Sequence, residues 1–81
     1  MENEIEVPAY AQVPPRANEF RTLVFENEHE EHVRKEFAGH GLKVMNAWSD
    51  DCVGRVKLDE RGDLMFKVRP GFNVFVTIMA A

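Results

Sequence analysis

The chain has few of the residues that would staple a small fold or anchor it in a membrane. Cys52 is the only cysteine among 81 residues, which excludes an internal disulfide and favours a reducing compartment. No apolar run approaches the roughly 18 residues that a membrane-spanning helix needs. No apolar stretch follows the acidic residues 1–4, so we expect no secretory signal. These features predict a cytoplasmic protein that makes no membrane contact.

The residue combinations that carry catalysis are also missing. The glycines are scattered among turn signals and form no phosphate-binding loop ahead of a helix. Asp50 and Asp51 are adjacent between two predicted strands, where such a pair usually makes a turn. Cys52 has no orienting partner in the sequence that would make it a nucleophile. We therefore expect a protein that is not an enzyme.

Three histidines and the single cysteine raise the question of a metal site. His29 and His32 are three residues apart, which places two side chains on one face of a helix. The four residues match no zinc-binding spacing, however, even when His40 and Cys52 are included. Glutamates surround the first two histidines, as on a solvated helix face. We expect neither a metal nor an organic cofactor.

The clearest signal in the chain is the alternation of apolar and polar residues over the last thirty positions. Alternation with a period of two residues is typical of half-buried β-strands, and turn residues separate the alternating segments. The segments cover residues 53–58, 64–69 and 72–79. They predict three consecutive antiparallel strands.

The turn of the first hairpin fixes its register. If residues 60–62 form a three-residue loop, Gly62 adopts the left-handed conformation and Asp59 faces Asp63. This register separates apolar from polar side chains, and a slip by one residue would mix the two faces. The apolar face consists of Val56, Leu58, Leu64 and Phe66, and the opposite face of Arg55, Lys57, Met65 and Lys67.

The second connection, around Pro70 and Gly71, predicts the position of the last strand. A loop of odd length keeps the apolar residues of segments 64–69 and 72–79 on the same face. The last strand is also apolar on its other face, through Phe75 and Met79. Such a strand must be covered on both sides, either by the helix of the domain or by a partner.

The first half of the chain predicts a strand, a helix and another strand. Residues 19–26 read as the first strand. Asn27 is a suitable N-cap for a helix that ends at the glycines at positions 39 and 41, and Glu30 stands three residues later as in a capping box. So short and polar a helix must be held by packing. Residues 42–49 alternate as a further strand.

These elements define the expected fold class and domain organisation. We predict an α+β protein in which one short helix packs on a mostly antiparallel sheet of four to five strands, in the order strand, helix and then four strands. Residues 19–81 are expected to form this single domain. Residues 1–18, which hold three of the four prolines, are expected to form an extended or flexible arm.

The inward-facing positions of the predicted elements give a candidate core. They are apolar residues that share one face of a strand or of the helix. The predicted core is Leu23, Phe25, Val33, Phe37, Val44, Val56, Leu58, Leu64, Phe66, Val68, Val74, Val76 and Ile78.

Apolar residues along the arm leave two interpretations open. The arm is either a loosely packed tail or an extended segment that adds to a sheet edge, in this molecule or in another. In the second interpretation the contacts come from Ile5, Val7 and Tyr10.

Charge is distributed unevenly along the chain, whose net charge is −4. Residues 1–51 hold 11 acids and 5 Lys or Arg, a net charge of −6, whereas residues 52–81 hold 3 acids and 5 Lys or Arg, a net charge of +2. The predicted hairpin places Arg55 opposite Lys67, an unfavourable pair unless an anion lies near. We therefore expect something acidic to cover or visit this face. The candidate contact residues are Arg55, Lys57, Met65, Lys67, Arg69 and Phe75.

Three sources could supply the acidic group. The acidic segments of the chain itself could cover the face, or an acidic protein surface could dock there. Nucleic acid is a third possibility, because Met65 and Phe75 could stack on bases, but the acidic net charge would repel phosphate at long range.

These features together favour a small binding protein. In general character the chain resembles small phage or plasmid proteins that bind and inhibit a host enzyme, since it is a single acidic domain with separated charge and no catalytic motif. That resemblance implies an inhibitor or modulator acting in the host cytoplasm. The alternatives are a structural subunit of a larger assembly, such as a virion, and a nucleic-acid-binding protein that uses the basic hairpin face.

Overall fold

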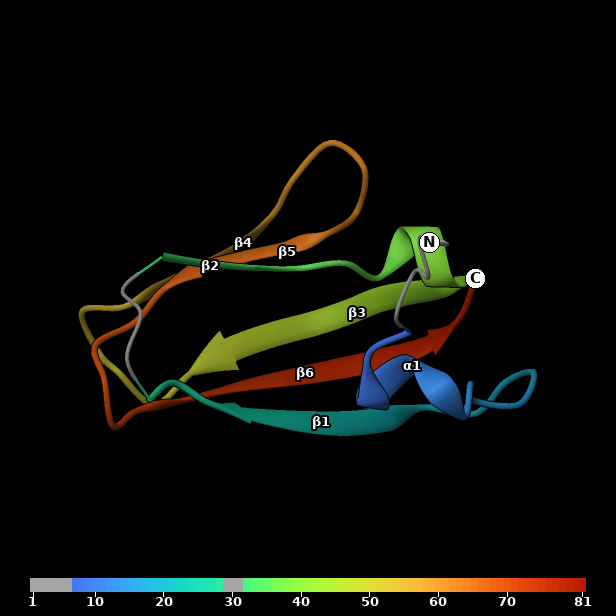
Figure 1. Ribbon diagram of the computed structural model, residues 1–81, viewed down its shortest axis with the longest axis horizontal. Coiled ribbons are helices and arrows are strands. Elements are labelled where there is room, and N and C mark those ends of the chain that lie inside the picture. Colours follow the sequence, from blue (N-terminus) through green and yellow to red (C-terminus); the bar gives the residue numbers. More distant parts are fainter. Residues whose placement is uncertain (1–6, 29–31) are drawn as a thin grey trace, which may run out of the picture.

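The computed structural model describes residues 7–28 and 32–81 as two three-stranded antiparallel sheets packed face to face (Figure 1). In one sheet β6 lies between β1 and β3, and in the other β5 lies between β2 and β4. The mostly antiparallel class with one short α-helix is confirmed, but the prediction of a single sheet of four to five strands is wrong. The strands are β1 (Arg21–Glu26), β2 (His32–Lys35), β3 (Leu42–Ser49), β4 (Arg55–Leu58), β5 (Leu64–Lys67) and β6 (Asn73–Ala80).

The hairpin of β4 and β5 has the predicted register. Arg55 faces Lys67, Val56 faces Phe66, and the pairing continues to the loop. Gly62 has a φ of +90°, and its N–H donates to the carbonyl of Asp59 at 3.1 Å. Glycine adopts this left-handed conformation without the steric strain of a side chain, so the turn sequence selects the register.

The prediction that β6 pairs with β5 is wrong. β6 instead pairs with β1 and β3, and residues 68–72 carry the chain from one sheet to the other. Asn27 holds this crossing through three hydrogen bonds, to the N–H of Gly71 and to the carbonyls of Phe72 and Val68. The apolar faces of β5 and β6 are therefore buried against each other, from opposite sheets.

The helix predicted from Asn27 to the glycines at 39 and 41 is not formed by the described residues of that segment. His32–Lys35 is strand β2, which pairs antiparallel with β5, and η1 (Ala38–His40) is a single 3₁₀ turn. As a helix, this segment would have few inward-facing apolar residues to hold it by packing. As a strand, it gains backbone hydrogen bonds to the free edge of β5. His29 and Glu30 lie outside the described residues.

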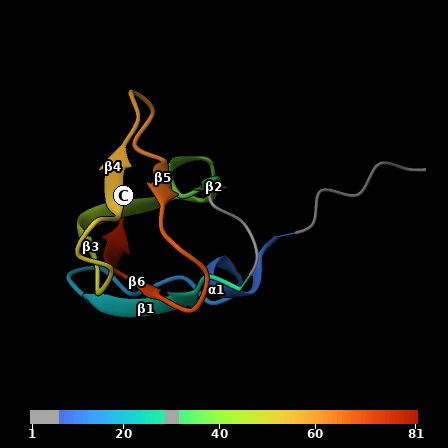
Figure 2. The ribbon, with the colours of Figure 1, turned by 90° about the vertical axis from the view of Figure 1, so that its left-hand side faces the viewer.

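The described part of the arm packs on the domain. The α-helix α1 (Ala9–Gln12) buries Ala11, and the ring of Tyr10 contacts those of Phe25 and Phe37, with centroids 5.3 and 5.0 Å away. The Tyr10 hydroxyl donates to the carbonyl of Glu36 at 2.9 Å. Figure 2 shows α1 beside β1, whereas the opposite side of the sandwich is closed by β3 lying against β4.

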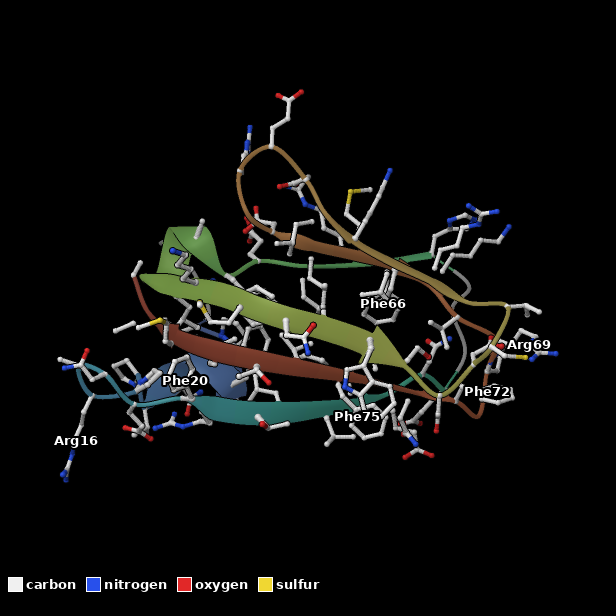
Figure 3. The ribbon with its side chains drawn as sticks, turned by 180° about the vertical axis from the view of Figure 1, so that it is seen from behind. Arg16, Phe20, Phe66, Arg69, Phe72 and Phe75 are labelled. Carbon is white, nitrogen blue, oxygen red and sulfur yellow. The ribbon has the colours of Figure 1, made fainter. Side chains whose placement is uncertain are left out.

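Most of the predicted core lies between the two sheets. Phe66 is 5% exposed and lies between the layers (Figure 3). Leu58 is the exception, since it is 45% exposed at the end of β4. Ala11 and Leu42 are buried as well and were not predicted. Of the predicted residues, Phe37, Val44, Leu64, Phe66, Val68, Val74, Val76 and Ile78 are buried, and Leu23, Phe25, Val33 and Val56 pack against them partly buried.

A bulge in β3 reverses the alternation of that strand. The pairing with β6 shifts between Val44 and Asn46, so that Met45 and Asn46 are both exposed. Ala47 then faces inward and Trp48 outward. An extra residue in one strand has this effect because successive side chains point to opposite faces.

Candidate partner-binding surfaces

The outer side of the β2–β5–β4 sheet carries five basic side chains around one methionine. We call this surface the basic face. The strand register arranges it in two rows across the sheet, and all six side chains are exposed. One row is His32, Lys67 and Arg55, and the other is Arg34, Met65 and Lys57.

Only one cation of the basic face is neutralised by the described part of the chain. Arg34 Nη2 lies 3.1 Å from the carboxylates of both Asp59 and Asp63. Arg55, Lys57 and Lys67 form no ion pair with any carboxylate in residues 7–28 and 32–81. Like charges that face each other across strands are destabilising, so this face retains an unsatisfied attraction for anions.

The basic face is shallowly hollowed. A groove of about 720 Å³ lies over the three strands, lined by side chains of the face, by Gly54, and by Val33, Val56 and Phe66. A Cβ on Gly54 would lie 3.2 Å from Val68 Cγ2 and from Asp51 Cβ, tighter than ordinary contact. Glycine therefore lets the chain turn closely against the loop that carries Asp51 before it enters β4.

Arg69 lines a small cavity together with Arg55 and Lys67 of the basic face, but its charge is paired with a buried carboxylate. Its Nη2 lies 2.6 Å from Asp51 Oδ1, and its backbone N–H donates to Asp51 Oδ2 at 2.9 Å. The guanidinium also lies over the ring of Phe72, 4.8 Å from the centroid. Figure 3 shows Arg69 and Phe72 together at one end of the sandwich. The guanidinium holds the pKa of the Asp51 carboxyl well below its usual range, against the opposing effect of burial.

Asp63 is the second buried carboxylate, and it joins the hairpin to η1. Its Oδ1 accepts the backbone N–H groups of Phe37 at 2.8 Å and Ala38 at 3.1 Å. These bonds, chiefly that from Phe37, lower the pKa of Asp63 although burial acts in the opposite direction. The carboxylate also accepts a hydrogen bond from Arg34 Nη2 at 3.1 Å, which holds this guanidinium at one edge of the basic face.

Phe75 does not lie among the cations, because β6 belongs to the other sheet. It stands on the outer side of the β1–β6–β3 sheet, in a row with Val24 and Trp48. The rings of Trp48 and Phe75 are stacked, with centroids 4.3 Å apart and planes 21° apart. Val24 is 58% exposed and Trp48 is 52% exposed.

The row of Phe75 is part of a larger apolar surface, which we call the apolar face. Phe20, 61% exposed, precedes β1 at the far end of the sheet, as Figure 3 shows. A row of polar residues, Thr22, Thr77 and Asn46, separates the two ends. The apolar face comprises Phe20, Val24, Met45, Trp48, Phe75 and Met79.

The alternation of β6 indicated part of the apolar face, but most of it was missed. Phe75 and Met79 were predicted to need a cover on their side of the sheet. Trp48 was not predicted to join them, because uninterrupted alternation would place it on the same side as Val44. The polar Asn46, at a position where alternation predicts an inward-facing residue, is the one local signal of a bulge.

The predicted arm contacts have different locations. Tyr10 packs against the core, whereas Val7 is 44% exposed. Ile5 lies outside the described residues. The described arm therefore includes an anchored helix. The outer strands β1, β3, β2 and β4 each leave one sheet edge unpaired by the described residues.

The remaining chemical candidates are dispersed. Within the described residues no three His, Cys, Asp or Glu side chains gather closely enough to hold a metal ion. Asp50 and Asp51 have separate structural tasks, since Asp50 accepts the backbone N–H of Asn73 at 2.7 Å. Cys52 is exposed. No described helix has the length and apolar character to span a membrane.

Comparisons with known proteins do not identify a relative. No protein-family model, curated protein or solved structure matches the chain significantly. Function must therefore be argued from the two faces themselves.

Proposed function

We propose that this chain is a non-enzymatic protein-binding module that docks through its basic face on an acidic surface of a protein partner. Occupying such a surface would make it an inhibitor or modulator of that partner. The observation that carries the proposal is the row His32, Lys67 and Arg55, in which basic side chains face one another across three strands without an ion pair to a described carboxylate.

The composition of the face supports a protein partner. Met65 lies in the second row between Arg34 and Lys57 and adds a flexible apolar side chain to a charged surface. The long stems of arginine and lysine add further apolar area beneath their charged ends. A protein surface with carboxylates around an apolar patch would complement this arrangement.

Nucleic acid fits the same face less well. Single strands bind to surfaces that combine cations with aromatic rings, on which the bases stack. The described side chains of the basic face include no Phe, Tyr or Trp, since Phe75 lies on the other sheet. The net charge of −4 also opposes the approach of a polyanion.

The test compares two charge-reversed variants of equal net charge. R55E/K67E reverses the central pair of the basic face, whereas R16E/R61E reverses two exposed arginines outside it. The immobilised parent should capture a protein from host lysate, and capture should weaken as salt is raised. R16E/R61E should retain the same protein, and R55E/K67E should lose it.

The same proteins can be titrated with a fluorescent single-stranded oligonucleotide near physiological salt. We expect no binding. Equal capture by R55E/K67E and the parent would contradict docking through the basic face. Oligonucleotide binding that only R55E/K67E loses would replace the protein partner with nucleic acid.

A structural subunit of a larger assembly, such as a virion, is the second candidate function. It is favoured by the apolar face, which an assembly would cover on the side of the molecule away from the basic face.

A further inference from the structure

We propose that a second copy of this chain packs on the apolar face, with its strands running antiparallel to those of the first. This inference concerns the β1–β6–β3 sheet and does not depend on docking by the basic face. It begins from the exposure of Val24 and Trp48, both more than half exposed on either side of Phe75.

No described element covers this face. α1 packs through Tyr10 and Ala11 onto core residues, and η1 directly follows the buried Phe37. A central strand that is apolar on both sides is typical of a strand that is covered on both sides. Sheets find such a cover by packing face to face, about 10 Å apart, as the two sheets of this chain already do.

The order of residues along the face makes it complementary to itself. The proposed twofold axis lies between the two copies, parallel to their sheets and perpendicular to the strands, over the polar row of Thr22, Thr77 and Asn46. Rotation about this axis places the row of Phe75 in one copy over the row of Met79 and Lys43 in the other. Aromatic rings then meet methionine sulfur, a favourable contact, and the polar rows meet each other.

The charges at the ends of the face favour the same arrangement. Lys43 lies opposite Met79 at one end, and Glu26 and Asp50 lie beyond Phe75 at the other. The twofold rotation brings Lys43 of one copy over Trp48 of the other, next to the acidic end. The cation can then contact the indole face and approach carboxylates of the opposite sign.

The size of the face predicts a weak association. Eight residues of β6 extend about 26 Å, and three strands with their side chains span about 15 Å, so each copy offers a footprint of about 400 Å². Stable interfaces bury about 800 Å² of accessible surface per partner. We expect a reversible dimer with a Kd on the order of 10–100 µM.

Trp48 is the only tryptophan and reports directly on the interface. Sedimentation of the full chain from about 5 µM to about 1 mM should show the average mass rising from 9.3 kDa toward twice that value. The emission of Trp48 should move to shorter wavelength over the same range, because the indole loses its contact with water. A monomer with constant emission over this range would overturn the proposal.

Two lysine variants locate the interface. V24K places a charge on the apolar face, whereas V53K alters a valine that is also exposed, at 65%, in the loop before β4. V24K should weaken the dimer at least tenfold and V53K should not. If V24K dimerises as the parent does, or if R55E/K67E abolishes the dimer, the interface lies elsewhere and the proposal fails.

A compensating pair tests the antiparallel arrangement. W48K should weaken the dimer strongly, because the rotation places the introduced amine against Lys43 of the other copy. Adding K43E to W48K should recover much of the lost affinity, since opposite charges then face each other. Folding of each variant is checked by circular dichroism, and a folded W48K/K43E no tighter than W48K would exclude this arrangement.

Discussion

At the scale of single residues, two buried carboxylates connect parts of the chain that are distant in sequence. Asp51 ties the loop before β4 to Arg69, and Asp63 ties the β4–β5 hairpin to η1. Each accepts several hydrogen bonds, so each is stabilised as the anion and its pKa is lowered. Protonation of either carboxylate would therefore weaken these connections.

The first prediction concerns the stability of the fold in acid. Because the folded-state pKa of Asp51 is lowered, its contribution is complete above the unfolded-state pKa of about 4 and is lost as the pH falls below it. D51N should be less stable than the parent at pH 7. It should also lose less stability than the parent between pH 5 and pH 2, as measured by urea unfolding at each pH.

The control for this titration is E60Q, at the exposed tip of the hairpin loop. Its loss of stability in acid should follow that of the parent. D63N should resemble D51N, because Asp63 is also stabilised as the anion. If D51N and the parent lost stability in parallel from pH 5 to pH 2, the ion pair with Arg69 would not contribute to the fold.

The second prediction tests the packing between the sheets. Phe66 lies in the middle of β5, opposite both Val33 and Val56, and faces the core. F66A should cost about 3–5 kcal/mol, because it removes buried apolar contacts and leaves a cavity. A domain this small would then be largely unfolded near room temperature.

M65A on the same strand provides the matched control. Met65 points to the basic face and is 37% exposed, so its truncation should change the free energy of unfolding by about 0.5 kcal/mol or less. Circular dichroism melts of both variants check the prediction. Equal melting temperatures for F66A and the parent would show that the strand faces are assigned wrongly.

At the scale of elements, local patterns predicted the strands better than their partners. The β4–β5 hairpin followed from alternation together with a turn that requires Gly62, and both signals lie within a dozen residues. The partner of β6 depends instead on contacts with β1, some fifty residues earlier in the chain. Alternation gives the buried face of a strand but not the sheet to which it belongs.

Segment 27–40 shows where tertiary pairing overrides local preference. Asn27 has the chemistry of a helix cap, yet its amide is used to hold the crossing between β5 and β6. Val33 fits an inward position in a strand as well as in a helix, so the sequence could not separate the two. Pairing with the free edge of β5 stabilises the strand, and nothing in the local sequence indicates that this edge is free.

The same limit applies to the candidate binding surfaces. The basic face was predictable because hairpin register alone aligns Arg55 with Lys67. His32 joined it only through β2, whose pairing was not predicted. Trp48 joined the apolar face only through the bulge in β3, which shifts its side chain to the outside.

At the scale of the whole molecule, the two outer sheet faces differ in chemistry while sharing one core. One face is basic on a protein whose net charge is −4, and the other is mainly apolar. A sandwich with both outer faces exposed can contact two different neighbours at once. This geometry links the proposed partner on the basic face with a second copy on the apolar face.

The last prediction weighs the local charge of the basic face against the charge of the whole protein. R55E places a carboxylate opposite Lys67, and a cross-strand pair of opposite charge contributes about 0.2–1 kcal/mol. It also makes the acidic chain more negative, which favours unfolding through self-repulsion. At 0.15 M salt the Debye length is about 8 Å, so the distant repulsion is screened and the local pair dominates. R55E should therefore be slightly more stable than the parent.

Urea unfolding of two further variants isolates the cross-strand effect. R61E makes the same charge change at the hairpin tip, without a cross-strand partner, and should be neutral or slightly destabilising. R55E/K67E restores a like-charged pair and should return to about the stability of the parent. If R55E and R61E had the same effect, Arg55 and Lys67 would not repel each other in the folded protein. The basic face would then lack the unsatisfied attraction for anions on which docking depends.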